Sequence, residues 1–225
     1  MTQNMKARLA GLLYLAGLPT AGFAYGYVAY LPKSDPAALV TTLQAGLGTL
    51  RWTILVGVPG FSLLYLIEVL LFRELLKSVC KMTADLMVLL VAASVPLALA
   101  ALAQRLSLVG LLEAGSPPAA DVMRLLQGET SLFQVATIFW GLWLLPLGWL
   151  SWRAGLVPRI VAGLLIVAGC LYLWAFAGPL ITGPQAPGSA SSPLALIMIA
   201  LTMIGELGFA LWLTIFGAKG LKATA

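Results

Sequence analysis

The stretch PLALIMIALTMIGELGFALWLTIFG, residues 193–217, decides the fold class of this chain. It is mostly apolar and long enough to cross the hydrocarbon core of a bilayer as one helix. Its only charged residue, Glu206, would lie near mid-membrane, where a carboxylate without a partner costs roughly 3 kcal/mol or more. Every Lys and Arg falls at or beyond the end of an apolar segment, so no basic partner is expected there. We therefore expect Glu206 to be protonated and hydrogen-bonded, or to face water inside the protein.

The composition of the whole chain points the same way. Hydrophobic residues make up 61% of the 225 residues and charged residues only 9%, which is more apolar side chain than one soluble core can hide. The net charge of +5 comes from basic residues scattered between apolar runs, so a nucleic-acid partner is not expected. Two cysteines without any histidine make no zinc, haem or copper site. We expect no cofactor.

Six apolar runs predict an all-α, six-helix transmembrane bundle that forms a single integral membrane domain. The first run resembles a signal peptide but is too long for one and is followed by further spans, so it is interpreted as a retained helix. Each run has about 20 residues or more, enough to span the bilayer. The predicted helices are 9–31, 52–72, 82–103, 132–152, 157–181 and 194–216.

Basic residues between the runs predict the orientation. Nine fall on the side of the two termini and four on the other side, and the positive-inside rule therefore places both termini in the cytosol. The nine are Lys6, Arg8, Arg73, Lys77, Lys81, Arg153, Arg159, Lys219 and Lys222. The four are Lys33, Arg51, Arg105 and Arg124.

The external connections contain signals for short helices. Ser34-Asp35-Pro36 predicts a capped helix start, and Ser116-Pro117-Pro118 predicts another. In the second of these helices, Asp121 and Arg124 would share an exposed face. Both helices are expected to lie on the membrane surface, and residues 183–192 are expected to form a loop.

Glu206 is the first candidate functional residue. Thr202 lies one turn earlier on the same helix face. The carboxyl either binds a proton or a ligand, or it only donates a hydrogen bond that holds helices together. Small residues gain packing contact only when another helix comes close. We therefore expect burial of the glycine faces formed by Gly11 with Gly17 and by Gly205 with Gly208.

Glu68 and Asp85 are further candidates, near the cytosolic ends of two consecutive antiparallel helices. The two carboxylates would then share one pocket. In the alternative, each pairs with a basic residue that reaches toward the membrane surface. Those basic residues are Arg73, Lys77 and Lys81.

Prolines and tryptophans suggest a cavity. Proline frees the carbonyl four residues earlier and kinks a helix, and kinked helices can enclose a space. Trp140 and Trp143, three residues apart, would either wall a hydrophobic pocket or face lipid. Four different predicted helices contain Pro19, Pro59, Pro96 and Pro146.

Three stretches together resemble one known family: RLAGLLYLAG at 8–17, GWLSWRAGLVPR at 148–159 and IGELGFALWL at 204–213. They are similar to the bacterial membrane family catalogued as domain of unknown function 4386, in the same order and across nearly the whole chain. The second stretch is the most specific. The resemblance implies a six-helix inner-membrane protein without an established activity, and it implies that Glu206 belongs to the family pattern.

The sequence leaves three functions open. In the first, the protein binds or transports a small lipophilic molecule in a cavity near Glu206. In the second, it is a non-enzymatic accessory or structural subunit of a membrane complex, or it forms a homo-oligomer. In the third, it is an intramembrane enzyme that uses Glu68, Asp85 or Glu206 as acid and base. In each case the expected location is the bacterial inner membrane, with the lipid bilayer as surroundings.

Overall fold

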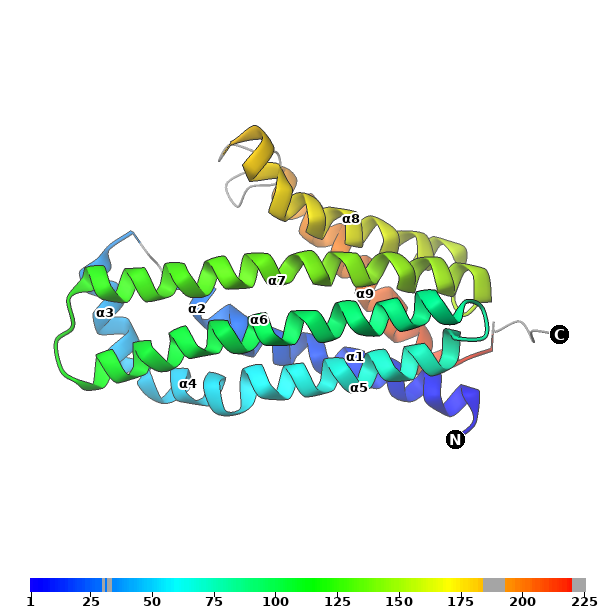
Figure 1. The fold of residues 1–225 in the computed structure, drawn as a ribbon, viewed down its shortest axis with the longest axis horizontal. Coiled ribbons are helices and arrows are strands. Elements are labelled where there is room, and N and C mark those ends of the chain that lie inside the picture. Colours follow the sequence, from blue (N-terminus) through cyan, green and yellow to red (C-terminus); the bar gives the residue numbers. More distant parts are fainter. Residues whose placement is uncertain (30, 32–33, 184–192, 220–225) are drawn as a thin grey trace. The chain divides into compact units, whose positions relative to one another are not determined.

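The computed structural model describes residues 1–29, 31, 34–183 and 193–219, and the regular structure in that part is helical throughout (Figure 1). Two short elements, η1 and η2, are π-helical turns inserted between α-helical segments. The elements in chain order are α1 (Gln3–Ala21), η1 (Gly22–Gly26), α2 (Tyr27–Ala29), α3 (Pro36–Ala45), α4 (Leu47–Trp52), η2 (Thr53–Gly57), α5 (Val58–Leu76), α6 (Lys81–Glu113), α7 (Ala119–Ala154), α8 (Arg159–Thr182) and α9 (Pro193–Phe216).

Six helical stretches among the described residues are long and apolar enough to cross a membrane. This confirms the prediction of an all-α chain with six spans, and the protein is of the multi-pass membrane class. The stretches are Gln3–Ala29, Leu47–Leu76, Lys81–Glu113, Ala119–Ala154, Arg159–Thr182 and Leu196–Phe216.

The third and fourth spanning helices are longer than predicted. Helix α6 continues to Glu113, although its predicted end was at residue 103, and α7 begins at Ala119 instead of 132. The separate surface helix expected after Pro118 is therefore wrong, because residues 119–131 are the first turns of α7. Hydropathy detects only the apolar part of a helix, so it does not include the polar turns at the helix ends. Arg124 does pair with Asp121 on an exposed face, at 3.2 Å.

The start of α3 agrees with its sequence signal. The Asp35 carboxylate accepts hydrogen bonds from the backbone N–H groups of Ala37 and Ala38 at 3.0 and 3.1 Å. Pro36 occupies the first helical position, where its missing N–H costs nothing. The cap satisfies N–H groups that a helix start otherwise leaves without partners.

The connection between α7 and α8 requires a glycine. Gly155 has a φ of 65°, in the left-handed region that side chains with a Cβ avoid. Its N–H bonds to the carbonyl of Trp152, and the N–H of Leu156 bonds to that of Ser151. This is the Schellman arrangement that ends helices. It explains the glycine in the stretch GWLSWRAGLVPR.

The prolines mostly lie inside helices, as predicted. Pro19, Pro96 and Pro146 lie within α1, α6 and α7, and Pro59 is the second residue of α5, directly after η2. The cytosolic position of both termini stays a prediction. Part of its basis, Lys33 and Lys222, lies outside the described residues, as do residues 184–192 of the predicted loop.

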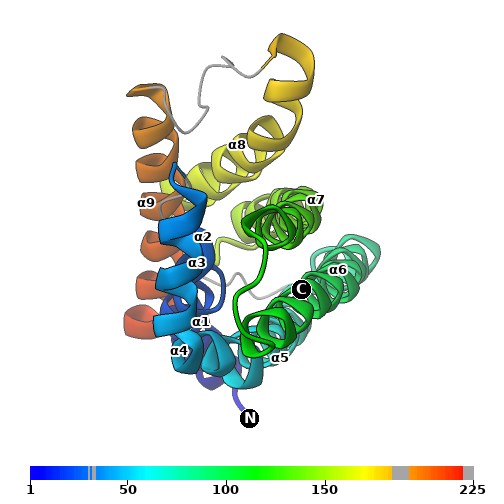
Figure 2. The same cartoon turned by 90° about the vertical axis from the view of Figure 1, so that its left-hand side faces the viewer.

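The chain divides into two compact units. The single-domain expectation stays a prediction. The first unit contains Met1–Ala16, Tyr65–Ser94 and Thr137–Ala225. Within it, α8 and α9 pack against each other (Figure 2). A Cβ added to Gly205 would lie 3.0 Å from the carbonyl oxygen of Leu164.

Glycine packing in the first unit follows the prediction with one exception. A Cβ on Gly11 would lie 2.7 Å from the backbone nitrogen of Thr214, so α1 and α9 nearly touch there. Gly17, which belongs to the second unit, is also buried. The expected burial of Gly208 is wrong, because nothing lies within 4 Å of the space its Cβ would fill. Gly208 is thus on the open side of α9.

The second unit contains Gly17–Leu64 and Val95–Ala136. Its main core joins α3 to the neighbouring ends of α6 and α7, as Figure 1 shows. The buried members of this core are Val28, Leu39, Val40, Leu43, Leu50, Leu108, Leu112, Val122 and Leu126.

Candidate functional site

Glu206 lies in α9 with 8% of its surface exposed, and two tyrosines donate to it. The Tyr14 hydroxyl from α1 donates to Oε2 at 2.6 Å, and the Tyr172 hydroxyl from α8 donates to Oε1 at 3.1 Å. The close approach of α8 to α9 at Gly205 brings Tyr172 within reach. Of the two arrangements expected from the sequence, the structure contains a hydrogen-bonded carboxyl, but Glu206 accepts both of the bonds described, whereas the expectation from the sequence is that it donates one.

Glu68 is the second buried carboxyl of this site. It lies on α5 with 3% of its surface exposed, and its Oε1 has no hydrogen-bond partner among the described residues. The Glu68 and Glu206 carboxyls are close enough to interact electrostatically. Neither Glu68 nor Glu206 takes part in an ion pair among the described residues. Two buried acids that interact without a basic partner are costly in a low-dielectric interior.

Aromatic rings surround the carboxyls. Tyr14 stacks on Trp143 with the ring centroids 6.2 Å apart, and Tyr65 meets Trp143 edge-on at 5.1 Å. Phe72 and Phe209 complete the cluster, with centroids 5.4 Å apart. Such rings make an apolar, closely packed wall. Glu68, Glu206, Tyr172 and these five rings are called the Glu206 cluster below.

Asp85 does not belong to the Glu206 cluster. Its carboxylate accepts hydrogen bonds from Arg73 at 2.6 Å and from Lys81 at 2.9 Å. For Asp85, the alternative of pairing with basic residues is therefore the one the structure contains. Glu68 instead interacts electrostatically with Glu206, a neighbour that the order of the helices along the chain does not reveal.

The other three candidates differ in position. Trp143 is buried in the Glu206 cluster, whereas Trp140, one turn earlier on α7, is only half-buried. Thr202 is buried one turn before Glu206, but the hydrogen bonds described for Glu206 come from tyrosines. The sequence reasoning anticipated a hydroxyl partner and did not identify which residues supply it.

A buried ion pair in the second unit was missed altogether. Arg105, 1% exposed, donates to Glu129 through Nε at 3.1 Å and through a second guanidinium nitrogen. Its third nitrogen donates to the Ala24 carbonyl at 2.6 Å and to the Thr53 hydroxyl at 2.9 Å. The statement that every Lys and Arg falls at the end of an apolar segment is therefore wrong, because Arg105 lies inside α6, eight residues before its last residue, Glu113.

One signal in the sequence would have found this pair. The turn between α6 and α7 is centred near Pro117, and Arg105 and Glu129 are twelve residues from it on either side. Residues equidistant from a tight turn between antiparallel helices lie opposite each other. A positive and a negative residue at such positions predict an ion pair.

The comparisons with known proteins agree with the resemblance described above. The model of the family "Domain of unknown function (DUF4386)" matches residues 9–217. The chain belongs to this family. Neither the comparison with curated proteins nor that with solved structures found a match. DUF4386 membership and the six spans together show a membrane protein of a family without an assigned function.

Proposed function

We propose that this DUF4386 protein binds or transports a small lipophilic molecule in the bacterial inner membrane, with Glu206 and Glu68 at the polar end of the binding site. One observation carries the proposal: Glu68 Oε1 is buried and has no hydrogen-bond partner among the described residues. Leaving such an atom without a partner costs about 1–3 kcal/mol, and more if the group is charged. Native proteins rarely retain that cost without a reason.

The surroundings of Glu68 indicate the kind of molecule. Glu206 already accepts one tyrosine hydroxyl on each oxygen, so Glu68 is the group in the cluster that lacks a donor. The walls are aromatic, and the ring centroids of Trp143 and Phe72 are 6.3 Å apart. A ligand with an apolar body and one hydrogen-bond donor matches both features. A carboxyl used only for packing would be expected to have its bonds made within the protein.

The test identifies the molecules that stay bound to the protein when it is extracted from the membrane. Gently extracted protein in lipid nanodiscs would be analysed by native mass spectrometry, for the wild type and for Glu68→Leu and Glu206→Leu. We expect a bound small molecule in the wild type and its loss in both variants. Glu113→Gln is the control, since Glu113 pairs with Arg51 on the exposed surface of the second unit. Wild-type protein with only bulk lipid, or unchanged occupancy in Glu206→Leu, would refute the proposal.

The same measurements address the two alternatives. An accessory subunit would use small residues to pack against partner helices, but Gly11, Gly141 and Gly205 already contact helices of this chain. Co-purifying subunits would nevertheless favour that role. An intramembrane enzyme would use the two carboxyls as acid and base. Turnover that is lost in Glu206→Gln, with unchanged stability, would favour the enzyme.

A further inference from the structure

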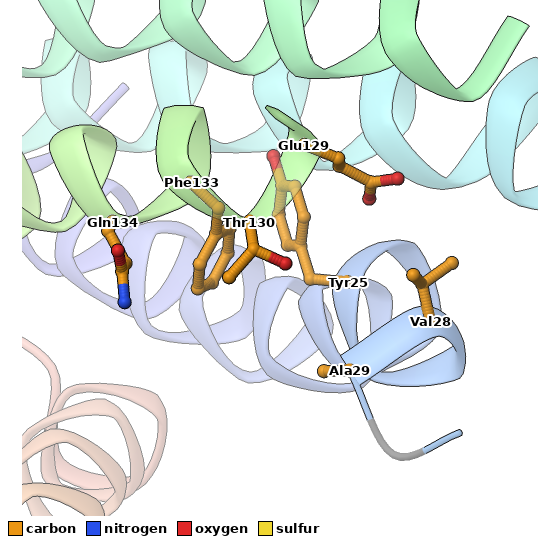
Figure 3. A pocket seen from close by; sticks show the side chains of 7 residues that line it. All are labelled: Tyr25, Val28, Ala29, Glu129, Thr130, Phe133 and Gln134. Atoms are coloured by element: carbon orange, nitrogen blue, oxygen red, sulfur yellow. The ribbon is translucent and has the colours of Figure 1, made fainter. Parts of the chain in front are cut away.

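A pocket of about 300 Å³ lies in the second unit and includes no residue of the Glu206 cluster. Its volume is at the lower end of the range for small-molecule sites. Figure 3 shows the rings of Tyr25 and Phe133 next to each other, with the Glu129 carboxylate beyond Tyr25. The lining residues are Tyr25, Val28, Ala29, Glu129, Thr130, Phe133 and Gln134.

Glu129 presents a fixed carboxylate to this pocket. Both hydrogen bonds from Arg105 go to Oε1, and the described residues give Oε2 none. Arg105 is itself held by Ala24 in η1 and Thr53 in η2, so the guanidinium cannot swing away without breaking four bonds. Glu129 is only 7% exposed, yet it lines the pocket. One oxygen of a nearly buried carboxylate is thus held in place and left available to an occupant.

The rest of the wall sets the shape of that occupant. The ring centroids of Tyr25 and Phe133 are 4.9 Å apart. Phe61 packs edge-on against Tyr25, with the ring centroids 5.7 Å apart. They form one aromatic surface. The Thr130 hydroxyl donates to the Leu126 carbonyl at 2.8 Å, which leaves its oxygen able to accept a bond.

The charge of the site favours an uncharged occupant. Arg105 and Glu129 neutralise each other, so a cation or an anion would lose its hydration without a net charge to replace it. We infer that this pocket binds a small uncharged molecule with a ring-shaped apolar body and a hydroxyl group that donates to Glu129 Oε2. This site is independent of the proposed function at the Glu206 cluster, since the two share no residue.

The experiment uses two probes, of which the second has the donor hydrogen of the first replaced by a methyl group. These are 4-propylphenol and its methyl ether, 4-propylanisole, titrated onto the full chain in nanodiscs, with empty nanodiscs correcting for partition into lipid. A hydrogen bond to a charged acceptor predicts at least about tenfold tighter binding of the phenol. Equal affinity for the two probes, or no binding above that of empty nanodiscs, would overturn the inference.

Two variants locate the binding. Ala29→Phe places a ring into the pocket without touching the ion pair, and we expect it to weaken phenol binding at least about tenfold. Ala100→Phe adds the same ring at an exposed position of α6 and should leave binding unchanged. Undiminished binding in Ala29→Phe, with the protein shown to be folded by its thermal unfolding midpoint, would overturn the inference. The comparison of phenol and ether uses wild-type protein, so it decides the question even if Ala29→Phe fails to fold.

Discussion

Replacing Arg105 by methionine should destabilise the protein more than any other single change discussed for this chain. Methionine is of similar length but donates nothing, so it leaves the buried Glu129 carboxylate unpaired and the Ala24 carbonyl and Thr53 hydroxyl without their donor. Removing one partner of a buried ion pair costs about 3–5 kcal/mol. The whole stability of a domain is only about 5–15 kcal/mol. Arg105→Met is therefore expected to bring the second unit close to unfolding.

A double-mutant cycle isolates the ion pair from the rest of the loss. Arg105→Met combined with Glu129→Leu removes both charges, and an apolar replacement of a buried pair is often close to neutral. The double variant should therefore be at least about 2 kcal/mol more stable than the two single losses predict by addition. The assay is reversible unfolding in mixed micelles, followed by tryptophan fluorescence and circular dichroism.

A matched surface pair controls for general effects of charge removal. Arg51 and Glu113 bond at 2.7 Å but are 53% and 45% exposed, so Arg51→Met should cost at most about 1 kcal/mol. The reasoning would be refuted if Arg105→Met cost no more than Arg51→Met. It would also be refuted if the stability lost in the double variant equalled the sum of the stabilities lost in Arg105→Met and Glu129→Leu.

Four further predictions concern the site, the helix packing and the orientation in the membrane. Glu206→Gln should change the free energy of unfolding little, whereas Glu206→Leu should lower it by about 1–3 kcal/mol because the buried Tyr14 hydroxyl loses its acceptor; equal losses in the two variants would contradict this. Gly141→Ala should lower it by about 1–3 kcal/mol, since the new Cβ would lie 2.8 Å from the carbonyl oxygen of Gly169. Gly208→Ala, at an open helical position, should be neutral or stabilising by up to about 1 kcal/mol. A higher thermal unfolding midpoint for Gly141→Ala, or a lower one for Gly208→Ala, would count against the packing described. Reporter fusions should place both chain ends in the cytosol, and a periplasmic signal from either end would contradict the orientation derived from the basic residues.

Features that depend on neighbours along the chain could be predicted from the sequence. The apolar runs indicated six spans, and Ser34-Asp35-Pro36 indicated the start of α3. The depth of Glu206 indicated a buried carboxyl with a hydrogen-bond partner. Each of these follows from local composition or spacing, so one sequence is sufficient.

Features that depend on which helices meet could not be predicted in this way. Glu68 interacts with Glu206 although 138 residues separate them, and Tyr14 donates to Glu206 from the opposite end of the chain. Arg105 was missed for a different reason. Its predicted helix ended at residue 103 because polar residues lower the hydropathy there, although the helix itself continues. A buried ion pair looks polar in sequence, and so it was interpreted as the end of the span.

The π-helical turns have a consequence for how this chain tolerates changes in length. A π turn holds about one residue more than an α turn at the same place. Deleting one residue from Thr53–Gly57 would therefore let the helix close as a regular α-helix with the flanking segments facing as before. Deleting one residue at 58–64, in the regular α-helix that follows, removes no extra residue, so it would rotate the preceding α4 by about 100° relative to the residues after the deletion. Leu50, fully buried, would leave the core, and Trp52, 60% exposed, would turn toward a different side. In this part of the protein, the number of residues in the chain, as much as their identity, determines which face of a helix points inward.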